Sequence, residues 1–357
     1  MIRGRPDVTV ERHELAPGYR ISRLLRGGWQ LAGGHGPVDR ARAIDDMALF
    51  LDRGVSTFDC ADIYTGAEEM IGEFRDRLER QRGVEALRSL KVHTKFVPDW
   101  DRLPSLDRVY VEGIIDRSLH RLKTDRLDLV QFHWWNYAAP GVVDVAMILR
   151  DLQRAGKIDR IGGTNFDTPH TEALIDAGVP LVSMQVQYSL LDPRAENGLV
   201  QLALRSGFGL LCYGTLAGGF LTNAWLGKPE PAEGTLTNRG LIKYKLIIDD
   251  FGGWSLFQEL LRALDRIARR HSANIAAVAG RWMLDRPAVA GIIVGARYAD
   301  HLADDLKVFD FSLDAADVAA VERVLAKRQG PTGDTFELER DRDGRHGRIM
   351  KYNLNAA

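Results

Sequence analysis

The stretch DRVYVEGIIDRSLHRLKTDRLDLVQFHWW, residues 107–135, joins a helical pattern to a buried-strand pattern. Over residues 107–123 the apolar side chains recur at helical spacing, as Val111, Ile114, Ile115, Leu119 and Leu122. Residues 127–134 then form a short apolar run with little alternation, which is typical of a parallel strand buried on both faces. A helix that leads directly into such a strand predicts an α/β protein.

The same alternation continues along most of the chain. Short apolar runs rich in β-branched residues occupy residues 22–28, 55–61, 91–96, 127–134, 158–165, 182–189, 208–216 and 291–296. Helical patterns lie between them, for example at 40–53, 142–156 and 196–206, and the last two run into Gly156 and Gly207. Eight strands in β-then-α order predict a closed (β/α)8 TIM barrel rather than an open doubly wound sheet.

Three segments exceed a minimal barrel. Residues 8–19 predict an N-terminal hairpin that plugs the barrel bottom, and residues 223–253 predict a long loop over the active face after the seventh strand. Residues 330–357 form a polar tail after a C-terminal helix, and this tail either packs across the barrel mouth or is partly mobile. We therefore expect one barrel domain over residues 1–357, with its core at about 22–329.

Composition narrows the class of protein. The chain has 357 residues, of which 45% are hydrophobic and 27% charged, and this excludes a disordered, collagen-like or disulfide-rich chain. The formal charge of −1 argues against nucleic acid as the partner. Cys60 and Cys212 stand in apolar stretches without a CxxC motif, as expected for buried packing in a reducing compartment. Without an apolar signal segment or a run of roughly 18 apolar residues, we expect a cytoplasmic protein that does not enter a membrane.

Residues at the C-terminal ends of barrel strands point toward the active site. Four positions at or just beyond these ends have side chains suited to proton transfer: Asp59, Tyr64, Lys95 and His133. The next strands end in groups suited to hydrogen bonding or stacking: Thr164, Asn165, Gln185 and Tyr213. Each has an ordinary alternative, such as a loop cap for Asp59, a packing ring for Tyr64 or a structural role for His133. Lys95 is the more unusual, because a lysine in an apolar strand end needs a partner.

Seven segments, in order, resemble the successive signatures of the aldo-keto reductase superfamily. They are TFDCADIYTGAEEMIGE (57–73), HTKF (93–96), LVQFHWW (129–135), GGTNF (162–166), MQVQYSLL (184–191), GTLAGGFLT (214–222) and IIVGARYADHLADDL (292–306). The resemblance runs from about residue 27 to about residue 311. It implies an NAD(P)H-dependent reductase or alcohol dehydrogenase that acts on a small aldehyde, ketone or sugar.

The resemblance also implies a catalytic role for four residues. Tyr64 would be the general acid, and Lys95 would lower the phenol pKa from its free value of about 10. Asp59 would hold Lys95 in place, and His133 would hydrogen-bond the substrate carbonyl oxygen. The substrate-binding residues are expected to be Trp29, Tyr64, His133 and Trp134, with Trp135 nearby. Trp225 and Trp254 are interpreted as core residues, and Glu68 as a helix cap.

For the cofactor, the resemblance implies a nicotinamide carboxamide held by Thr164, Asn165 and Gln185, and a ring stacked on Tyr213. Glycines in the stretch 214–221 would let backbone approach a pyrophosphate. The full expected set is Gly28, Trp29, Thr164, Asn165, Gln185, Tyr213, Gly214, Thr215, Leu216, Gly218, Leu221, Gly295, Arg297, His301, Asp304 and Asp305. Arg297 is the candidate cation for a 2′-phosphate, so NADPH is expected and NADH stays open. The alternative role for Arg297 is that of a solvent-exposed cation at the start of a helix.

Two other functions are weighed against the reductase. The chain also resembles the potassium-channel β subunits, so a cofactor-sensing regulatory subunit is an alternative that the four catalytic positions do not exclude. A metal-dependent hydrolase is disfavoured, because His13, His93 and His133 form no H-x-H or H-E-x-x-H pattern. We therefore expect no metal and a small-molecule partner, and a homo-oligomer stays open.

Overall fold

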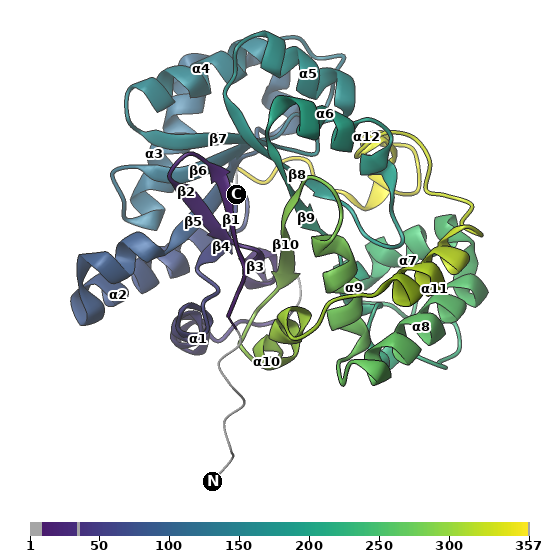
Figure 1. Ribbon diagram of the computed structural model, residues 1–357. Coiled ribbons are helices and arrows are strands. Elements are labelled where there is room, and N and C mark those ends of the chain that lie inside the picture. The colour runs from purple at the N-terminus through teal and green to yellow at the C-terminus, as the bar shows by residue number, and fades with distance from the viewer. Residues whose placement is uncertain (1–8, 34–35, 356–357) are drawn as a thin grey trace.

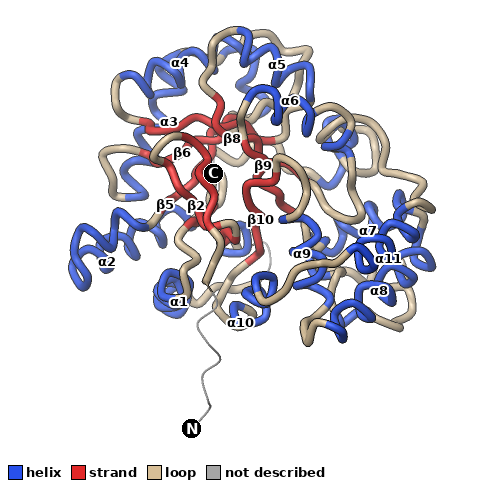
Figure 2. The backbone as a smooth tube through the Cα atoms, in the orientation of Figure 1, coloured by secondary structure: helices blue, strands red, loops and turns tan. Residues whose placement is uncertain are grey.

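A closed barrel of eight parallel strands forms the centre of the protein in the computed structural model, which describes residues 9–33 and 36–355 (Figures 1 and 2). The strands neighbour one another in the order β10-β3-β4-β5-β6-β7-β8-β9. They are β3 (Leu24–Gly27), β4 (Thr57–Asp59), β5 (Lys91–Phe96), β6 (Leu127–Phe132), β7 (Ile158–Thr164), β8 (Leu181–Gln187), β9 (Gly209–Tyr213) and β10 (Val289–Gly295). The predicted (β/α)8 barrel is confirmed.

Helices surround the barrel, as Figure 2 shows in blue around the red strands. They are α1 (Arg40–Asp52), α2 (Ala67–Ser89), α3 (Arg108–Leu122), α4 (Val142–Arg154), α5 (Thr168–Asp176), α6 (Leu199–Ser206), α7 (Arg239–Phe251), α8 (Gly253–Arg270), α9 (Ile275–Leu284), α10 (Leu302–Asp305), α11 (Ala315–Leu325) and α12 (Glu337–Arg340). Local signals set their ends. Asp107 caps α3 by accepting from the backbone N–H of Tyr110 at 2.8 Å. Gly207 ends α6 in the left-handed conformation at φ 78°.

The N-terminal hairpin consists of β1 (Arg12–Ala16) and β2 (Tyr19–Ser22), which pair antiparallel. Three of its side chains, Leu15, Tyr19 and Ile21, are buried against residues of the barrel strands, namely Leu25, Leu129, Leu211, Ala290 and Ile293. In each strand these residues come before the C-terminal end, where the candidate site lies. The hairpin therefore closes the other end of the barrel, at the N-terminal ends of the strands. The predicted hairpin is confirmed from residue 12 onward, and its predicted first residue, Val8, lies outside the described residues.

The prediction of one long loop over residues 223–253 is wrong, because residues 239–251 form α7. Asn238 caps this helix by accepting from the N–H groups of Gly240 and Leu241. Tyr244 of α7 packs directly against Gly214 and Gly218, and a Cβ on either glycine would collide with it. Both glycines have positive φ angles, 74° and 64°, which favour glycine. These glycines therefore let α7 approach the end of β9.

Two tryptophans flanking this segment belong to an aromatic cluster. The ring of Phe220 lies 4.6 Å from Trp225 and 5.9 Å from Trp254. Trp254 also packs on Phe257 with ring centroids 5.0 Å apart. Trp254 is buried and Trp225 is half-buried, so the interpretation of both as core residues holds.

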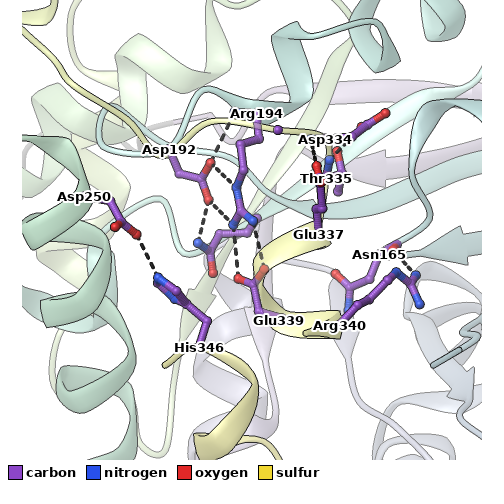
Figure 3. Close-up of polar contacts among 12 residues, drawn as sticks. Asn165, Asp192, Arg194, Asp250, Asp334, Thr335, Glu337, Glu339, Arg340 and His346 are labelled. Atoms are coloured by element: carbon purple, nitrogen blue, oxygen red, sulfur yellow. Dashed lines mark hydrogen bonds and ion pairs between the residues drawn. The ribbon is translucent and has the colours of Figure 1, made fainter. Parts of the chain in front are cut away.

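The C-terminal tail packs over the mouth of the barrel and is anchored by a buried ion cluster. Figure 3 shows the guanidinium of Arg194 between two carboxylates, with Asp192 at 2.7 Å and Glu339 of α12 at 2.9 Å. All three side chains are at most 1% exposed. Farther along the tail, Nε2 of His346 lies 2.7 Å from a carboxylate oxygen of Asp250 in α7. Of the two expectations for the tail, the structure has the packed one.

We expect Glu339→Ala to destabilise the protein by about 3–5 kcal/mol at neutral pH, because one carboxylate partner of the buried Arg194 guanidinium is removed with its two hydrogen bonds. Burial raises the pKa of Glu339, but the charge and hydrogen bonds of Arg194 lower it more, to about 2, from 4.5. The stabilisation is therefore complete above about pH 4.5 and is lost as the pH falls toward 2.

Urea denaturation of wild type and variant at pH 7 and at about pH 3 measures this difference. Glu322→Ala, at an exposed position of α11, is the control and should change stability by less than about 0.5 kcal/mol. Equal stability of wild type and Glu339→Ala at pH 7 would contradict the expectation.

Candidate active site

Side chains from three other strands converge on the carboxylate of Asp59, which ends β4. The ammonium of Lys95 donates to Oδ1 at 2.9 Å and to Oδ2 at 2.8 Å. The amide nitrogens of Gln131 and Gln185 donate to Oδ1 at 3.1 and 2.6 Å. All four side chains are buried. The ion pair is therefore held by β4, β5, β6 and β8 together, with its lone pairs occupied by donors.

The ammonium of Lys95 also lies beside Tyr64. Its Nζ is 5.0 Å from the centre of the Tyr64 ring and donates to the carbonyl oxygen of Cys60 at 2.7 Å. Burial lowers the pKa of Lys95, but the charges of Asp59 and Tyr64 and the hydrogen bond to Asp59 raise it more. Lys95 therefore stays a cation at neutral pH.

The pKa of Tyr64 departs from the expectation. Burial raises this pKa by more than the charge of Lys95 lowers it, and Asp59 adds to the rise. Lys95 lowers the pKa of Tyr64 as expected, but burial is the larger effect, and the pKa lies above its ordinary value. The phenol keeps its proton at neutral pH, which is the state that a general acid needs.

His133 follows β6, and its position fixes the proton on one ring nitrogen. Nδ1 lies 3.1 Å from the carbonyl oxygen of Thr164, and a carbonyl can only accept, so Nδ1 carries the proton. Nε2 is buried and has no hydrogen-bond partner among residues 9–33 and 36–355. Burial, followed by the charge of Arg340, lowers the pKa of His133 to about 3.

A neutral imidazole in this tautomer accepts a hydrogen bond at Nε2 and cannot donate one there. This corrects the expectation that His133 donates to a substrate carbonyl oxygen. The group that fits Nε2 is a hydroxyl, such as that of an alcohol, a carbonyl hydrate or a sugar.

The aromatic wall beside His133 differs from the predicted one. Trp134 is fully buried in the core, and its Nε1 donates to the carbonyl of Asn136. Successive side chains of an extended chain alternate in direction, so Trp135 lies against His133, with ring centres 4.2 Å apart. Phe336 of the tail lies 5.5 Å from the same imidazole. The expected contact of Trp134 with substrate is therefore replaced by Trp135 and Phe336, while Trp29 is half-buried directly after β3.

The residues expected at the nicotinamide gather at the ends of β7, β8 and β9. The hydroxyl of Tyr213 donates to Oδ1 of Asn165 at 2.8 Å, and Asn165 has a φ of 63°. Thr164 Oγ1 donates to the carbonyl of Gln185 at 3.2 Å. One N–H of the Gln185 side-chain amide is used by Asp59, which leaves its oxygen and its second N–H for a cofactor.

Two groups near Tyr213 fit an anionic nucleotide. Thr215 Oγ1 is buried and has no hydrogen-bond partner in the described part of the chain. The ammonium of Lys243, from α7, lies 5.0 Å from the centre of the Tyr213 ring. Burial lowers the pKa of Lys243 by more than the charges of Glu339 and Asp192 raise it. A buried hydroxyl without a hydrogen-bond partner and a half-buried ammonium, both within the described residues, are groups that a pyrophosphate would satisfy.

The remaining expected cofactor residues have packing roles that the structure makes visible. The N–H of Gly28 donates to the carbonyl of Asp59 at 2.7 Å, and a Cβ on Gly28 would lie 2.8 Å from that oxygen. Leu221 is buried, and Leu216 packs against the core. Gly295 has the amide of Gln30 where a Cβ would stand.

The adenosine end lies after β10. Arg297 extends near Gly36 and donates to the carbonyl of Pro37 at 3.5 Å, while His301 is exposed. Asp304 pairs with Lys307 at 2.6 Å. Burial and the charge of Asp304 raise the pKa of Asp305 to about 7. The negative charge of both carboxylates is therefore reduced near the candidate phosphate position.

Two other predictions, on Glu68 and on the two cysteines, can be compared with the structure. Glu68 is not a helix cap: α2 begins after Gly66, and the buried carboxylate of Glu68 instead accepts from Thr94 Oγ1 at 2.6 Å. Cys60 and Cys212 are buried and free, as expected. In the described chain, no group of three His, Cys, Asp or Glu side chains is arranged to hold a metal ion, and no helix is long and apolar enough to cross a membrane.

Four site residues escaped the sequence analysis: Gln131, Lys243, Phe336 and Arg340. Gln131 had a visible signal, because it is a polar side chain inside the apolar run of β6. Phe336 and Arg340 stand in the segment interpreted as a tail, where no periodicity or motif indicates which side chains turn toward the site. Lys243 stands in the segment interpreted as a loop, where the apolar spacing of α7 marks a helix but does not indicate which polar side chain turns toward the site.

A barrel with ionisable side chains gathered at the C-terminal ends of its strands is a fold that many enzymes share. The model of the aldo/keto reductase family matches residues 23–326. The chain therefore belongs to this family, which confirms the resemblance seen in the sequence. It is an NAD(P)-dependent reductase.

Relatives match over almost the whole chain. Aldo-keto reductase YhdN of Bacillus subtilis (strain 168) is 27% identical over 337 residues, which cover 89% of this chain and 95% of the relative. The NADH-specific methylglyoxal reductase of Escherichia coli (strain K12) is 25% identical over 334 residues, covering 86% and 95%. The structure of the glycerol dehydrogenase AKR11B4 from Gluconobacter oxydans superposes with a TM-score of 0.74 at 23% identity, covering 93% of this chain and 99% of that one. This last likeness shows the shared fold.

We expect the imidazole of His133 to stay neutral from about pH 5 upward, with its proton on Nδ1, because its folded pKa is about 3. This pKa lies below the ordinary value of 6.5, so the unfolded chain takes up the proton first. The contribution of His133 to the free energy of unfolding is therefore fully present above pH 6.5 and is lost as the pH falls toward 3.

The ring ¹⁵N chemical shifts of protein labelled at histidine report both the charge and the tautomer. His133→Gln identifies the signals by their loss. A titration near pH 6.5, or a proton on Nε2, would show that the site differs from this description.

Proposed function

We propose that this protein is an NADPH-dependent reductase that interconverts a small aldehyde, ketone or sugar carbonyl and its alcohol, with Tyr64 as the proton donor. The observation that carries the proposal is the phenol of Tyr64 beside the buried ion pair of Lys95 and Asp59. The bound cofactor would supply the hydride. The protein's own residues would then manage the proton and the position of the substrate.

The proton step follows from the charges around Tyr64. Burial keeps the phenol protonated before the reaction, so a proton is available at Oη. When Tyr64 gives this proton to the developing alkoxide, the ammonium of Lys95 stabilises the phenolate that is left. Asp59 keeps Lys95 charged and in place through both of its carboxylate oxygens. In the oxidation direction the same phenolate takes the proton back.

The substrate is positioned by the groups around His133. Nε2 of the neutral imidazole accepts from a hydroxyl of the substrate or product, and Trp135 and Phe336 bound the space beside the ring. A carbonyl compound with a hydroxyl or hydrated neighbour fits this acceptor. Relatives named for methylglyoxal and glycerol act on small oxygenated compounds of this kind, which supports the choice.

For the cofactor, Lys243 and Thr215 are proposed at the pyrophosphate, and Arg297 at the 2′-phosphate of NADPH. The reduced charge of Asp304 and Asp305 favours an anion there. One relative is NADH-specific, so NADH is the competing choice. We also place the protein in the cytoplasm, where the free thiols of Cys60 and Cys212 would stay reduced.

We expect Tyr64→Phe to lower kcat by about 10²–10⁴-fold, because the general acid is removed. The dissociation constant of NADPH should stay within about twofold, since the hydroxyl carries no cofactor contact in this mechanism. The measurement is NADPH oxidation with methylglyoxal and with 4-nitrobenzaldehyde, together with a fluorescence titration of the cofactor. Full activity of the variant would overturn the mechanism, and tight NADPH without turnover by the wild type would favour the regulatory-subunit alternative.

We expect Lys243→Met to weaken NADPH binding by about tenfold or more, because a charge-assisted hydrogen bond to the pyrophosphate is lost. NADH should be weakened by the same factor, since both cofactors carry the pyrophosphate. The matched control is Lys245→Met on the same helix, whose ammonium pairs with Glu230 at 2.7 Å and Asp249 at 2.6 Å. If both lysine variants bind NADPH like the wild type, Lys243 does not hold the cofactor.

A further inference from the structure

Arg340 of the tail contacts the backbone of two segments beside His133: the residues that directly follow it and the segment at Asn165. Its Nη1 donates to the carbonyl oxygens of Trp134 and Trp135, the second at 2.8 Å. Its Nη2 donates to the carbonyl oxygen of Asn165 at 2.7 Å and to the hydroxyl of Tyr137 at 2.7 Å. Figure 3 shows Arg340 on the tail beside Asn165.

These acceptors lie in the two segments that position the imidazole. Trp134 and Trp135 directly follow His133 in the chain, so they set where its side chain begins. Asn165 directly follows Thr164, whose carbonyl holds Nδ1 of His133. A single guanidinium therefore ties the segment that carries the imidazole to the segment that orients it.

We propose that Arg340 is a positioning residue of the reductase reaction, which holds His133 in place with its proton on Nδ1 through the backbone of Trp134, Trp135 and Asn165. This rests on the role of His133 in the proposed function. It assigns to the C-terminal tail a part in catalysis beyond covering the mouth of the barrel.

The guanidinium is itself fixed by its surroundings. Its central carbon lies 3.8 Å from the centre of the Tyr137 ring, and that ring stacks on His170 at 3.4 Å and an angle of 4°. His170 in turn lies 2.7 Å from the carboxylate of Asp167, which caps α5. The planar guanidinium makes four hydrogen bonds and stacks on the Tyr137 ring, so its orientation is fixed. A lysine ammonium cannot reproduce this arrangement.

The tail delivers Arg340 to this position through its neighbours. Glu339, the preceding residue, is locked in the buried cluster with Arg194. Asp334 accepts from the N–H of Thr168 at 3.0 Å, at the start of α5. These contacts fix the tail just before Arg340, so little freedom is left to its backbone.

The charge of Arg340 acts in the same direction as its geometry. After burial, this charge is the largest cause of the lowered pKa of His133. The hydrogen bonds of the Arg340 guanidinium go to backbone carbonyls and to the Tyr137 hydroxyl, none of which carries a negative charge. Arg340 therefore favours a neutral imidazole as well as a fixed one.

The test compares Arg340→Met with Arg342→Met in the full-length protein. Arg342 is a second tail arginine, and its guanidinium is stacked over Trp100 at 4.7 Å and Tyr352 at 4.9 Å. We expect Arg340→Met to lower kcat with NADPH and methylglyoxal by about 10–100-fold, as for small displacements of a catalytic group. KM should change by less than about threefold, and Arg342→Met should behave like the wild type.

The second readout needs no turnover. The ¹⁵N signals of the His133 ring should change from one tautomer, protonated at Nδ1, to a mixture in Arg340→Met but not in Arg342→Met. Unchanged kcat together with an unchanged tautomer in folded Arg340→Met would overturn the proposal. A loss of kcat with an unchanged tautomer would also overturn it, because Arg340 would then act in another way.

Arg340→Lys keeps the test decisive if Arg340→Met does not fold. It retains the charge without the fork, so we expect a kcat loss of about fivefold or more and a mixed tautomer. Wild-type values for both readouts would overturn the proposal. Failure of the proposed function is separate: it would appear as full activity of Tyr64→Phe, while the ring signals would still report what Arg340 does to His133.

Discussion

The ion pair between Asp59 and Lys95 is the contact on which the rest of the barrel mouth depends. Both side chains are about 5% exposed, and removing two charges from water is costly unless every lone pair and proton finds a partner. Gln131, Gln185 and the carbonyl of Cys60 supply those partners. Because the donors come from different strands, the barrel must close correctly before the charges are satisfied. The position of the cation beside Tyr64 is thus a consequence of the fold.

The sequence analysis could locate this centre because two rules operate at once. Buried parallel strands appear as continuous apolar runs, and their C-terminal ends share one mouth, so Asp59, Lys95 and His133 could be grouped without coordinates. The same rules say little about direction within a strand end. Trp134 and Trp135 are equal in composition, and only the alternation of side chains sends the first into the core and the second toward His133.

The tail and α7 could not be predicted in the same way. Arg340 contacts carbonyl oxygens 175 to 206 residues away in sequence, and every residue type has such an oxygen. No pattern of side chains therefore identifies its partners. For α7 the signals were present, as the Asn238 cap and the spacing of Tyr244, Ile247 and Ile248, but Gly, Pro and Lys in the flanking residues obscured them.

Burial and neighbouring charges together decide which groups at the barrel mouth are charged and which are neutral. Beside Tyr64, burial would remove the charge of Lys95, but the carboxylate of Asp59 overcomes this effect, so that a cation stands next to the phenol from which a proton would leave. Around His133, burial and a nearby cation act together, so that the ring stays neutral and offers an acceptor. Two groups with such opposed environments are suited to different tasks: in the proposed reaction Tyr64 would exchange the proton, and His133 would orient the molecule that receives it.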